Sequence, residues 1–227
     1  MVSREEFKRT TVEMLRLAAT RLPEDVIDAL EAARKREEKR EAKSQLDAIL
    51  ENLKVAERKG IPMCQDTGLP IFFIEAGRNT DLDFNLEEVL RGAIREATEQ
   101  VPLRPNVVDP LTRENSGDNT GEEHPLVHLE RVEGEGLEVE LMLKGAGSEN
   151  WSRLFMLNPN SSEEQIVDEV TNVIEEAEGQ VCPPTIIGLG IGGTADRASL
   201  IAKKVLLKPL DKRNEDERLA LLEEKIT

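Results

Sequence analysis

The chain has 227 residues, which is enough for one large domain or two small ones. Acidic residues outnumber basic ones by 46 to 30, giving a formal charge of -16. This negative field repels nucleic acids and anionic membranes, so we expect neither as a partner. Aromatic residues make up only 3% of the chain, so the core must be mainly aliphatic.

The sequence contains no apolar run near the ~20 residues that a membrane span needs. Its first residues also lack the apolar stretch of a signal peptide, so we expect a soluble, cytoplasmic protein. The two cysteines, Cys64 and Cys182, are far apart in sequence. In a reducing compartment such cysteines are better interpreted as free thiols or metal ligands than as a disulfide.

The first sixty residues have the pattern of helices. Ser3 and Glu6 form a capping box, and apolar residues then recur at helical spacing until Pro23 starts a second helix. A third helix is predicted from Ser44 to about Arg58, ended by Gly60. We therefore expect a helical N-terminal region over residues 1–60.

A compact polar cluster follows, between Pro62 and Pro70. Residues 64–68 supply a thiol, a carboxamide, a carboxylate, a hydroxyl and a glycine, and the apolar run Ile71–Ile74 comes next. The run predicts a buried strand, which would hold the polar side chains at its entrance. The alternative is a structured turn with a half-buried free cysteine.

The middle of the chain alternates regular elements with a long polar loop. Asn85 is expected to cap a helix over Leu86–Gln100. Residues 104–121 contain too many Pro, Gly, Asn and Asp residues for a helix or central strand, so an ordered, internally hydrogen-bonded loop is predicted, with a surface excursion as the alternative. Leu126–Val132 and Leu137–Lys144 alternate apolar and polar residues around a glycine-containing turn, which predicts a β-hairpin.

Two glycine-rich stretches follow. Residues 144–151 could form an anion-binding nest, because small residues let the backbone approach a ligand. After a helix predicted from Ser162 to about Glu178, an apolar run leads through Gly188–Gly193 into a helix over Ala195–Leu206. Strand, glycine turn and helix would suit a dinucleotide, but the βαβ unit and the downstream acid that this site requires are missing.

The expected fold class is α+β, with a helical N-terminal region packed on a small, mostly antiparallel sheet with flanking helices. We expect an α+β domain over residues 61–210 and a C-terminal helix within residues 211–227.

Taken together, the polar motifs resemble those of the class I, iron–sulfur-dependent fumarate hydratase and L-tartrate dehydratase family, in its α subunit or N-terminal domain. The resemblance runs in order from about residue 10 to residue 210. It rests on Cys64-Gln65-Asp66-Thr67-Gly68, Arg104-Pro105-Asn106, Asp109-Pro110, Lys144 through Asn150, Cys182-Pro183-Pro184 and Gly188–Gly193.

The resemblance implies reversible addition of water across the double bond of a small dicarboxylate, with a [4Fe–4S] cluster as Lewis acid. Cys64 and Cys182 would be two of its three thiolate ligands. Gln65 and Asp66 would contact the substrate, and both are expected to be catalytic. Arg104 would pair with a substrate carboxylate and Gly147 would offer its backbone N–H.

The resemblance also implies a third cysteine, downstream of the Cys-Pro-Pro motif, whereas this chain has two cysteines. We expect a truncated or split form, or a partner that supplies the missing ligand. A β subunit or C-terminal domain would complete the active site, within an oligomer. The alternative functions are a non-catalytic dicarboxylate-binding or assembly subunit of the same family, and a dinucleotide-binding enzyme built on Gly188–Gly193.

Overall fold

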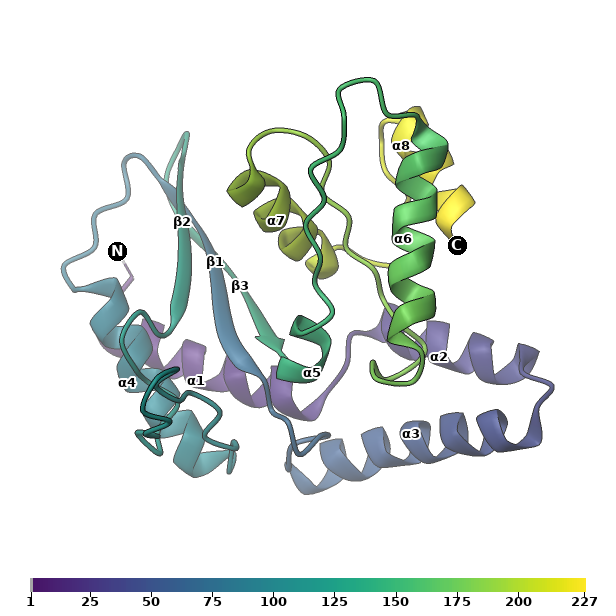
Figure 1. The fold of residues 1–227 in the computed structure, drawn as a ribbon. Helices are drawn as coiled ribbons and strands as arrows, with labels where there is room; N and C mark the ends of the chain where they lie inside the picture. The colour runs from purple at the N-terminus through teal and green to yellow at the C-terminus, as the bar shows by residue number, and fades with distance from the viewer. Residues whose placement is uncertain (1) are drawn as a thin grey trace. The chain divides into compact units, whose positions relative to one another are not determined.

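The computed structural model describes residues 2–227 and has the expected α+β fold (Figure 1). The chain forms two compact units. The first contains the residues up to Pro23 together with Arg34–Ala146, and the second contains Glu24–Ala33 and Gly147–Thr227. None of the helices in the described part of the chain is long and apolar enough to cross a membrane.

The first unit contains three helices and three strands. These are α1 (Arg4–Thr20), α3 (Arg40–Lys59), α4 (Leu86–Gln100), β1 (Leu69–Gly77), β2 (Leu126–Val132) and β3 (Leu137–Lys144). A further helix, α2 (Glu24–Arg36), has residues in both units.

The predicted caps of these helices are confirmed. Ser3 Oγ accepts from the N–H of Glu6, and Asn85 Oδ1 accepts from the N–H of Glu88. Gly60 ends α3 in the left-handed conformation. Helix α3 begins at Arg40, four residues before the predicted start at Ser44, because the break between α2 and α3 falls earlier, at residues 37–39 within a run of mixed charge.

The sheet has the strand order β2-β1-β3, so the predicted hairpin is wrong in its pairing although both of its strands have the predicted bounds. Strand β1 lies between them, parallel to β2 and antiparallel to β3 (Figure 1). The reason is the burial of Ile71–Ile74, each at most 3% exposed. A strand buried this fully needs hydrogen-bond partners on both edges.

The short connection from β2 to β3 therefore passes over the end of β1. Gly77, the last residue of β1, donates its N–H to Gly136 O at 3.0 Å. A Cβ atom at Gly77 would lie 2.5 Å from Gly134 O, so this crossing requires glycine. The sheet is consequently mixed, with one parallel and one antiparallel pair.

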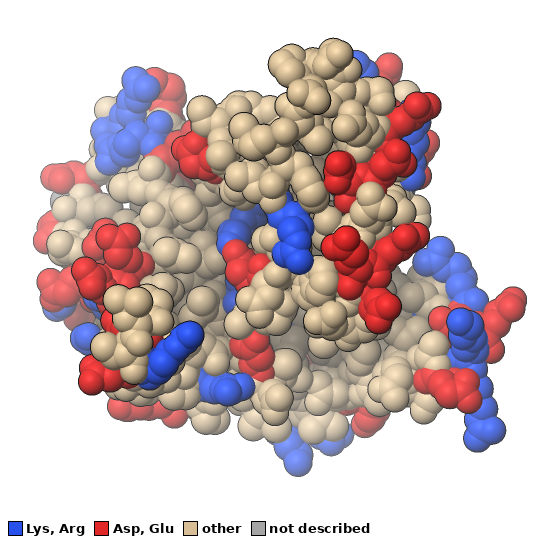
Figure 2. Space-filling view, in the orientation of Figure 1, with Lys and Arg blue, Asp and Glu red and all other residues tan. Residues whose placement is uncertain are grey.

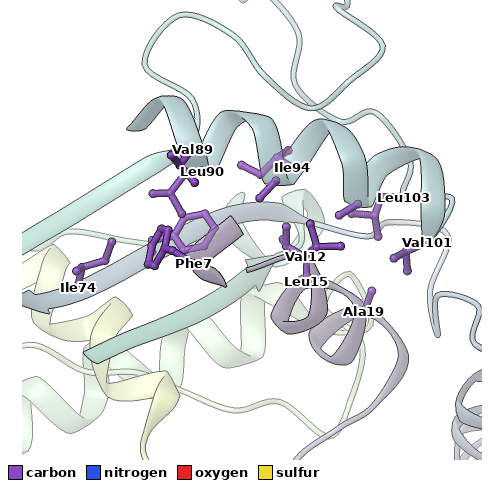
Figure 3. Packing of buried hydrophobic residues seen from close by; sticks show 13 residues of the cluster. Phe7, Val12, Leu15, Ala19, Ile74, Val89, Leu90, Ile94, Val101 and Leu103 are labelled. Carbon is purple, nitrogen blue, oxygen red and sulfur yellow. The ribbon is translucent and has the colours of Figure 1, made fainter. Parts of the chain in front are cut away.

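Helices α1 and α4 pack together against the sheet and form the main core with it (Figure 3). The most deeply buried side chains include Leu15 of α1, Leu90 and Ile94 of α4, and Phe72 and Ile74 of β1. Burying each such side chain stabilises the fold by roughly 1.5–3 kcal/mol. The core is aliphatic with few aromatic rings, as the composition requires.

The second unit is helical. It contains α6 (Glu163–Ala177), α7 (Ala195–Lys204) with the 3-10 turn η1 (Val205–Leu207), and α8 (Glu217–Ile226). The short helix α5 (Ala146–Glu149) joins the two units in sequence. Ser162 caps α6 as predicted, since its Oγ accepts from the N–H of Gln165.

The run before α7 is extended but forms no strand among the described residues, so the strand of the dinucleotide interpretation is absent there. Its glycines have a packing role instead. A Cβ at Gly188 would lie 2.0 Å from Ala202 O, and one at Gly190 would lie 2.1 Å from Ala198 O. Both glycines are therefore needed for the close approach of this segment to α7.

The long polar loop after α4 is ordered and internally hydrogen-bonded, as predicted. Buried Asn119 accepts at Oδ1 from the N–H of Asn106 (2.6 Å) and donates from Nδ2 to Thr98 Oγ1 (3.1 Å) and Arg104 O (3.0 Å). Its neighbour Asp118 accepts from Ser116, Thr120 and Arg95. These bonds fix the loop on α4.

We expect Gly68→Ala to destabilise the first unit by about 2–4 kcal/mol, because strain and overpacking act together. Gly68 has a φ of +80°, and an added Cβ would lie 2.7 Å from Leu143 C. Gly60→Ala is the matched control, since Gly60 also has positive φ but has open space around it. Urea unfolding followed by circular dichroism should show a smaller loss for Gly60→Ala, about 1 kcal/mol. Equal losses would contradict the role given to the close approach.

A second expectation concerns the pKa of Asp118. Partial burial opposes its ionisation, but hydrogen bonds from Ser116, Thr120 and Arg95 outweigh burial and hold the pKa below its usual range. This stabilisation is fully present above the unfolded-state pKa of about 3.9, and is lost as the pH falls through the lower folded-state value. Asp118→Asn should therefore lower the free energy of unfolding by about 1 kcal/mol at neutral pH.

The difference between Asp118→Asn and the parent chain should shrink steadily below about pH 4. Urea unfolding at a series of pH values measures it. A difference that grows on acidification would show that the carboxylate is not stabilised in the folded state.

Candidate functional site

The loop before β1 is fastened by the carboxylate of Asp66. Its Oδ1 accepts from the N–H of Gly68 at 3.1 Å and from Asn106 Nδ2 at 3.0 Å, and its Oδ2 accepts from the N–H of Ala146 at 2.9 Å. The three donors come from the same loop, from the polar loop after α4, and from the first residue of α5, just after β3. Asp66 is therefore held in one orientation by partners remote in sequence.

Thr67 makes a second connection between the same two loops. Its buried Oγ1 accepts from the N–H of Arg104 at 3.1 Å and lies 3.3 Å from Arg104 O. Asn106 Nδ2 adds a bond to Gly68 O at 3.2 Å. The backbone of Arg104 is consequently fixed next to the loop that carries Cys64, Gln65 and Asp66.

A pocket of about 430 Å³ lies where these loops meet, entirely within the first unit. Three of the predicted site residues line it, namely Cys64, Gln65 and Arg104, and all three are exposed. Within residues 2–227, the Arg104 guanidinium makes no ion pair or hydrogen bond. The pocket thus presents a thiol, a carboxamide and an uncompensated positive charge.

Most of the remaining lining residues come from α3 and the segment after it. They are Asn52, Ile61, Pro62 and Met63, together with Thr67 and Pro102. Asn52 Nδ2 donates to Met63 O at 2.7 Å, and the N–H of Met63 donates to Ala19 O at 2.9 Å. These bonds hold the chain on the N-terminal side of Cys64 in place.

The structure brings four of the six predicted site residues together in one unit: Cys64, Gln65, Asp66 and Arg104. Gly147 and Cys182 belong to the second unit. Gly147 is exposed in α5, directly after the residue whose N–H contacts Asp66, and Cys182 is an exposed free thiol.

Sequence reasoning missed two contributors to the site. Asn106 belongs to a motif singled out in the sequence, but its bond to Asp66 had no local signal. The N–H of Ala146 was likewise hidden in a glycine-rich stretch assigned to anion binding. Only the packing of β3 beside β1 brings Ala146 within reach of Asp66.

No group of three His, Cys, Asp or Glu side chains able to hold a metal ion occurs within residues 2–227. Both thiols are nevertheless exposed and unbridged, which leaves each available as an iron ligand. Each cysteine therefore has the donor chemistry of an iron–sulfur cluster ligand.

Comparison with known proteins gives consistent matches. The family model for fumarate hydratase (fumerase) matches residues 8–227. A putative L(+)-tartrate dehydratase subunit alpha from Methanocaldococcus jannaschii is 47% identical over 220 residues, covering 95% of this chain and 77% of that protein.

Two further relatives extend the comparison. The L(+)-tartrate dehydratase subunit alpha of Escherichia coli strain UTI89 is 32% identical, with 91% of this chain and 69% of that subunit covered. A putative fumarate hydratase class I from Geobacillus stearothermophilus is 36% identical, with 98% and 45% covered, so the chain spans less than half of that relative. From the family match and these identities, the chain belongs to the class I fumarate hydratase family of hydro-lyases, together with the tartrate dehydratase α subunits.

Proposed function

We propose that this chain is the α component of an iron–sulfur hydro-lyase that reversibly hydrates fumarate to malate or dehydrates tartrate. The observation that carries the proposal is that Cys64, Gln65 and Arg104 line the same pocket, with Asp66 fixed in the same loop as Cys64 and Gln65. Two of the relatives are called subunit alpha, which supports a β subunit as the partner that completes the site.

Arg104 is the proposed anchor for a substrate carboxylate. Its planar guanidinium can bind a carboxylate through two parallel hydrogen bonds, and it has no competing carboxylate in residues 2–227. Its backbone N–H donates to Thr67 Oγ1 and its C=O accepts from Asn119 Nδ2, and these bonds fix the position of the Arg104 backbone. The backbone N–H of Gly147 is the proposed second donor to the dianion.

Asp66 is proposed to hold and transfer the proton through one of its carboxylate oxygens, Oδ2. A carboxylate offers about four lone-pair positions. Two on Oδ1 are used by Gly68 and Asn106, and one on Oδ2 is used by Ala146. The remaining position on Oδ2 is open to a substrate proton or hydroxyl, and the exposed carboxamide of Gln65 would orient that hydroxyl.

Cys64 and Cys182 are the proposed ligands of a [4Fe–4S] cluster from this chain. When bound, such a cluster supplies a Lewis-acid iron for the substrate's oxygens. The chain's own residues bind the carboxylate, orient the hydroxyl and manage the proton. A second candidate, a non-catalytic dicarboxylate-binding or assembly subunit, is favoured by the presence of two cysteines where the cluster needs three thiolates.

The proposal is tested by anaerobic iron–sulfur reconstitution of this chain with a β partner, followed by iron counting and assays with fumarate and tartrate. We expect iron and activity in the pair. Cys64→Ala and Cys182→Ala should each abolish iron retention, because a cluster ligand is lost. Dicarboxylate binding by a pair that takes up no iron would overturn the catalytic proposal in favour of the non-catalytic subunit.

Asn106→Ala tests whether the orientation of Asp66 matters for the reaction. We expect kcat of the reconstituted pair to fall about 10–100-fold with KM little changed, because a small misplacement of a catalytic group is costly. Asn115→Ala is the matched control, since Asn115 Nδ2 donates to Pro105 O in the same loop and does not contact Asp66.

Amide hydrogen exchange supplies a readout for Asn106→Ala that is independent of activity. Exchange of the Ala146 N–H should become faster in Asn106→Ala and stay unchanged in Asn115→Ala. Faster exchange without a loss of kcat would mean that Asn106 orients Asp66 but that Asp66 does not take part in the reaction.

A further inference from the structure

Two stretches of the second unit, Arg153–Leu157 and Thr185–Ile191, are extended but belong to no helix or strand. Within the described residues, none of their backbone N–H or C=O groups is hydrogen-bonded to another part of the chain. Extended backbone with unused donors and acceptors is what the edge of an incomplete sheet presents.

Both stretches also expose large apolar side chains. In the first, Met156 is 83% exposed, and Leu154, Phe155 and Leu157 are exposed as well. In the second, the exposed side chains are Ile186, Ile187 and Ile191. Contiguous apolar surface of this kind marks an interaction site in a soluble protein.

The second stretch has one covered face and one uncovered face. Gly188 and Gly190 lie directly against α7, where no side chain fits between the segment and the helix. Residues alternate in extended backbone, so Ile187 and Ile191 project from the opposite face. The segment therefore has the geometry of a strand that packs against α7 on one face but has no neighbouring strand among the described residues.

The charge of these stretches restricts what can cover them. Acidic residues number 46 in the whole chain, yet none occurs in either stretch, and Arg153 is the single basic residue. Figure 2 shows mainly uncharged surface over the segment that joins α5 to α6. The complementary surface is thus apolar and uncharged.

We propose that each of these two stretches is a docking surface for an extended apolar segment from the portion of the family's α subunit that lies outside the shared region. The shared region covers 77% and 69% of the two α subunits compared above, so each has a further portion of polypeptide. The incoming segments pair their backbone with the unused groups of each stretch and cover the exposed isoleucines and Met156. This inference does not depend on the reaction.

The test uses the unmatched portion of the Methanocaldococcus jannaschii α subunit, produced as a separate polypeptide and added to this chain. Hydrogen exchange should slow at least tenfold in both Arg153–Leu157 and Thr185–Ile191. Unchanged exchange in either stretch would overturn the proposal. Protection that appears in this chain alone and rises with its concentration would instead assign the surface to a second copy.

Two exposed-site variants keep the test specific. Met156→Asp places a charge in the docking surface and should weaken binding of the added polypeptide at least tenfold. Leu111→Asp is the matched control, because Leu111 is 90% exposed and lies in the first unit, outside the docking surface. The Leu111→Asp variant should bind the added polypeptide as tightly as the parent chain does. Equal weakening by both variants would contradict the proposed location. Slower exchange in these stretches with a β subunit, but not with the added polypeptide, would contradict the proposed occupant.

Discussion

The hydrogen bonds of the Asp66 carboxylate are the constraint on which the candidate site depends. They connect the loop before β1 with Asn106, 40 residues away, and with Ala146, 80 residues away. Loops of this length lose considerable conformational entropy when they are ordered, so each needs fixed attachment points. One half-buried side chain supplies attachment points for three segments, and the pocket is formed where they meet.

The mixed sheet makes this arrangement possible. Because β1 is the central strand, its first residue, Leu69, lies opposite Lys144 at the end of β3. The polar loop that precedes β1 is thereby brought to the glycine-rich stretch that follows β3. The antiparallel pairing of β1 with β3, which the predicted hairpin did not include, therefore gives Asp66 this neighbour.

Sequence reasoning succeeded where the physical cause is local and failed where it is not. Ser3, Asn85 and Ser162 act on N–H groups three residues away, so their caps could be predicted from neighbouring residues alone. Strand pairing depends on which run is most deeply buried, and the bond from Asn106 to Asp66 depends on that pairing. Cys64, Gln65, Asp66 and Arg104 were brought together by motif resemblance, not by any pattern of spacing.

A strongly acidic chain can still present a site for a dianion, because the range of its charges is short. At physiological ionic strength the field of exposed charges decays over about 8 Å. Several acids in the first unit are neutralised nearby, as in the ion pairs Arg4–Glu88, Lys8–Glu96 and Arg95–Asp118. Arg104 lacks such a partner within the described residues and lines the pocket. Arg104 therefore places a positive charge at the pocket although the net charge of the chain is -16.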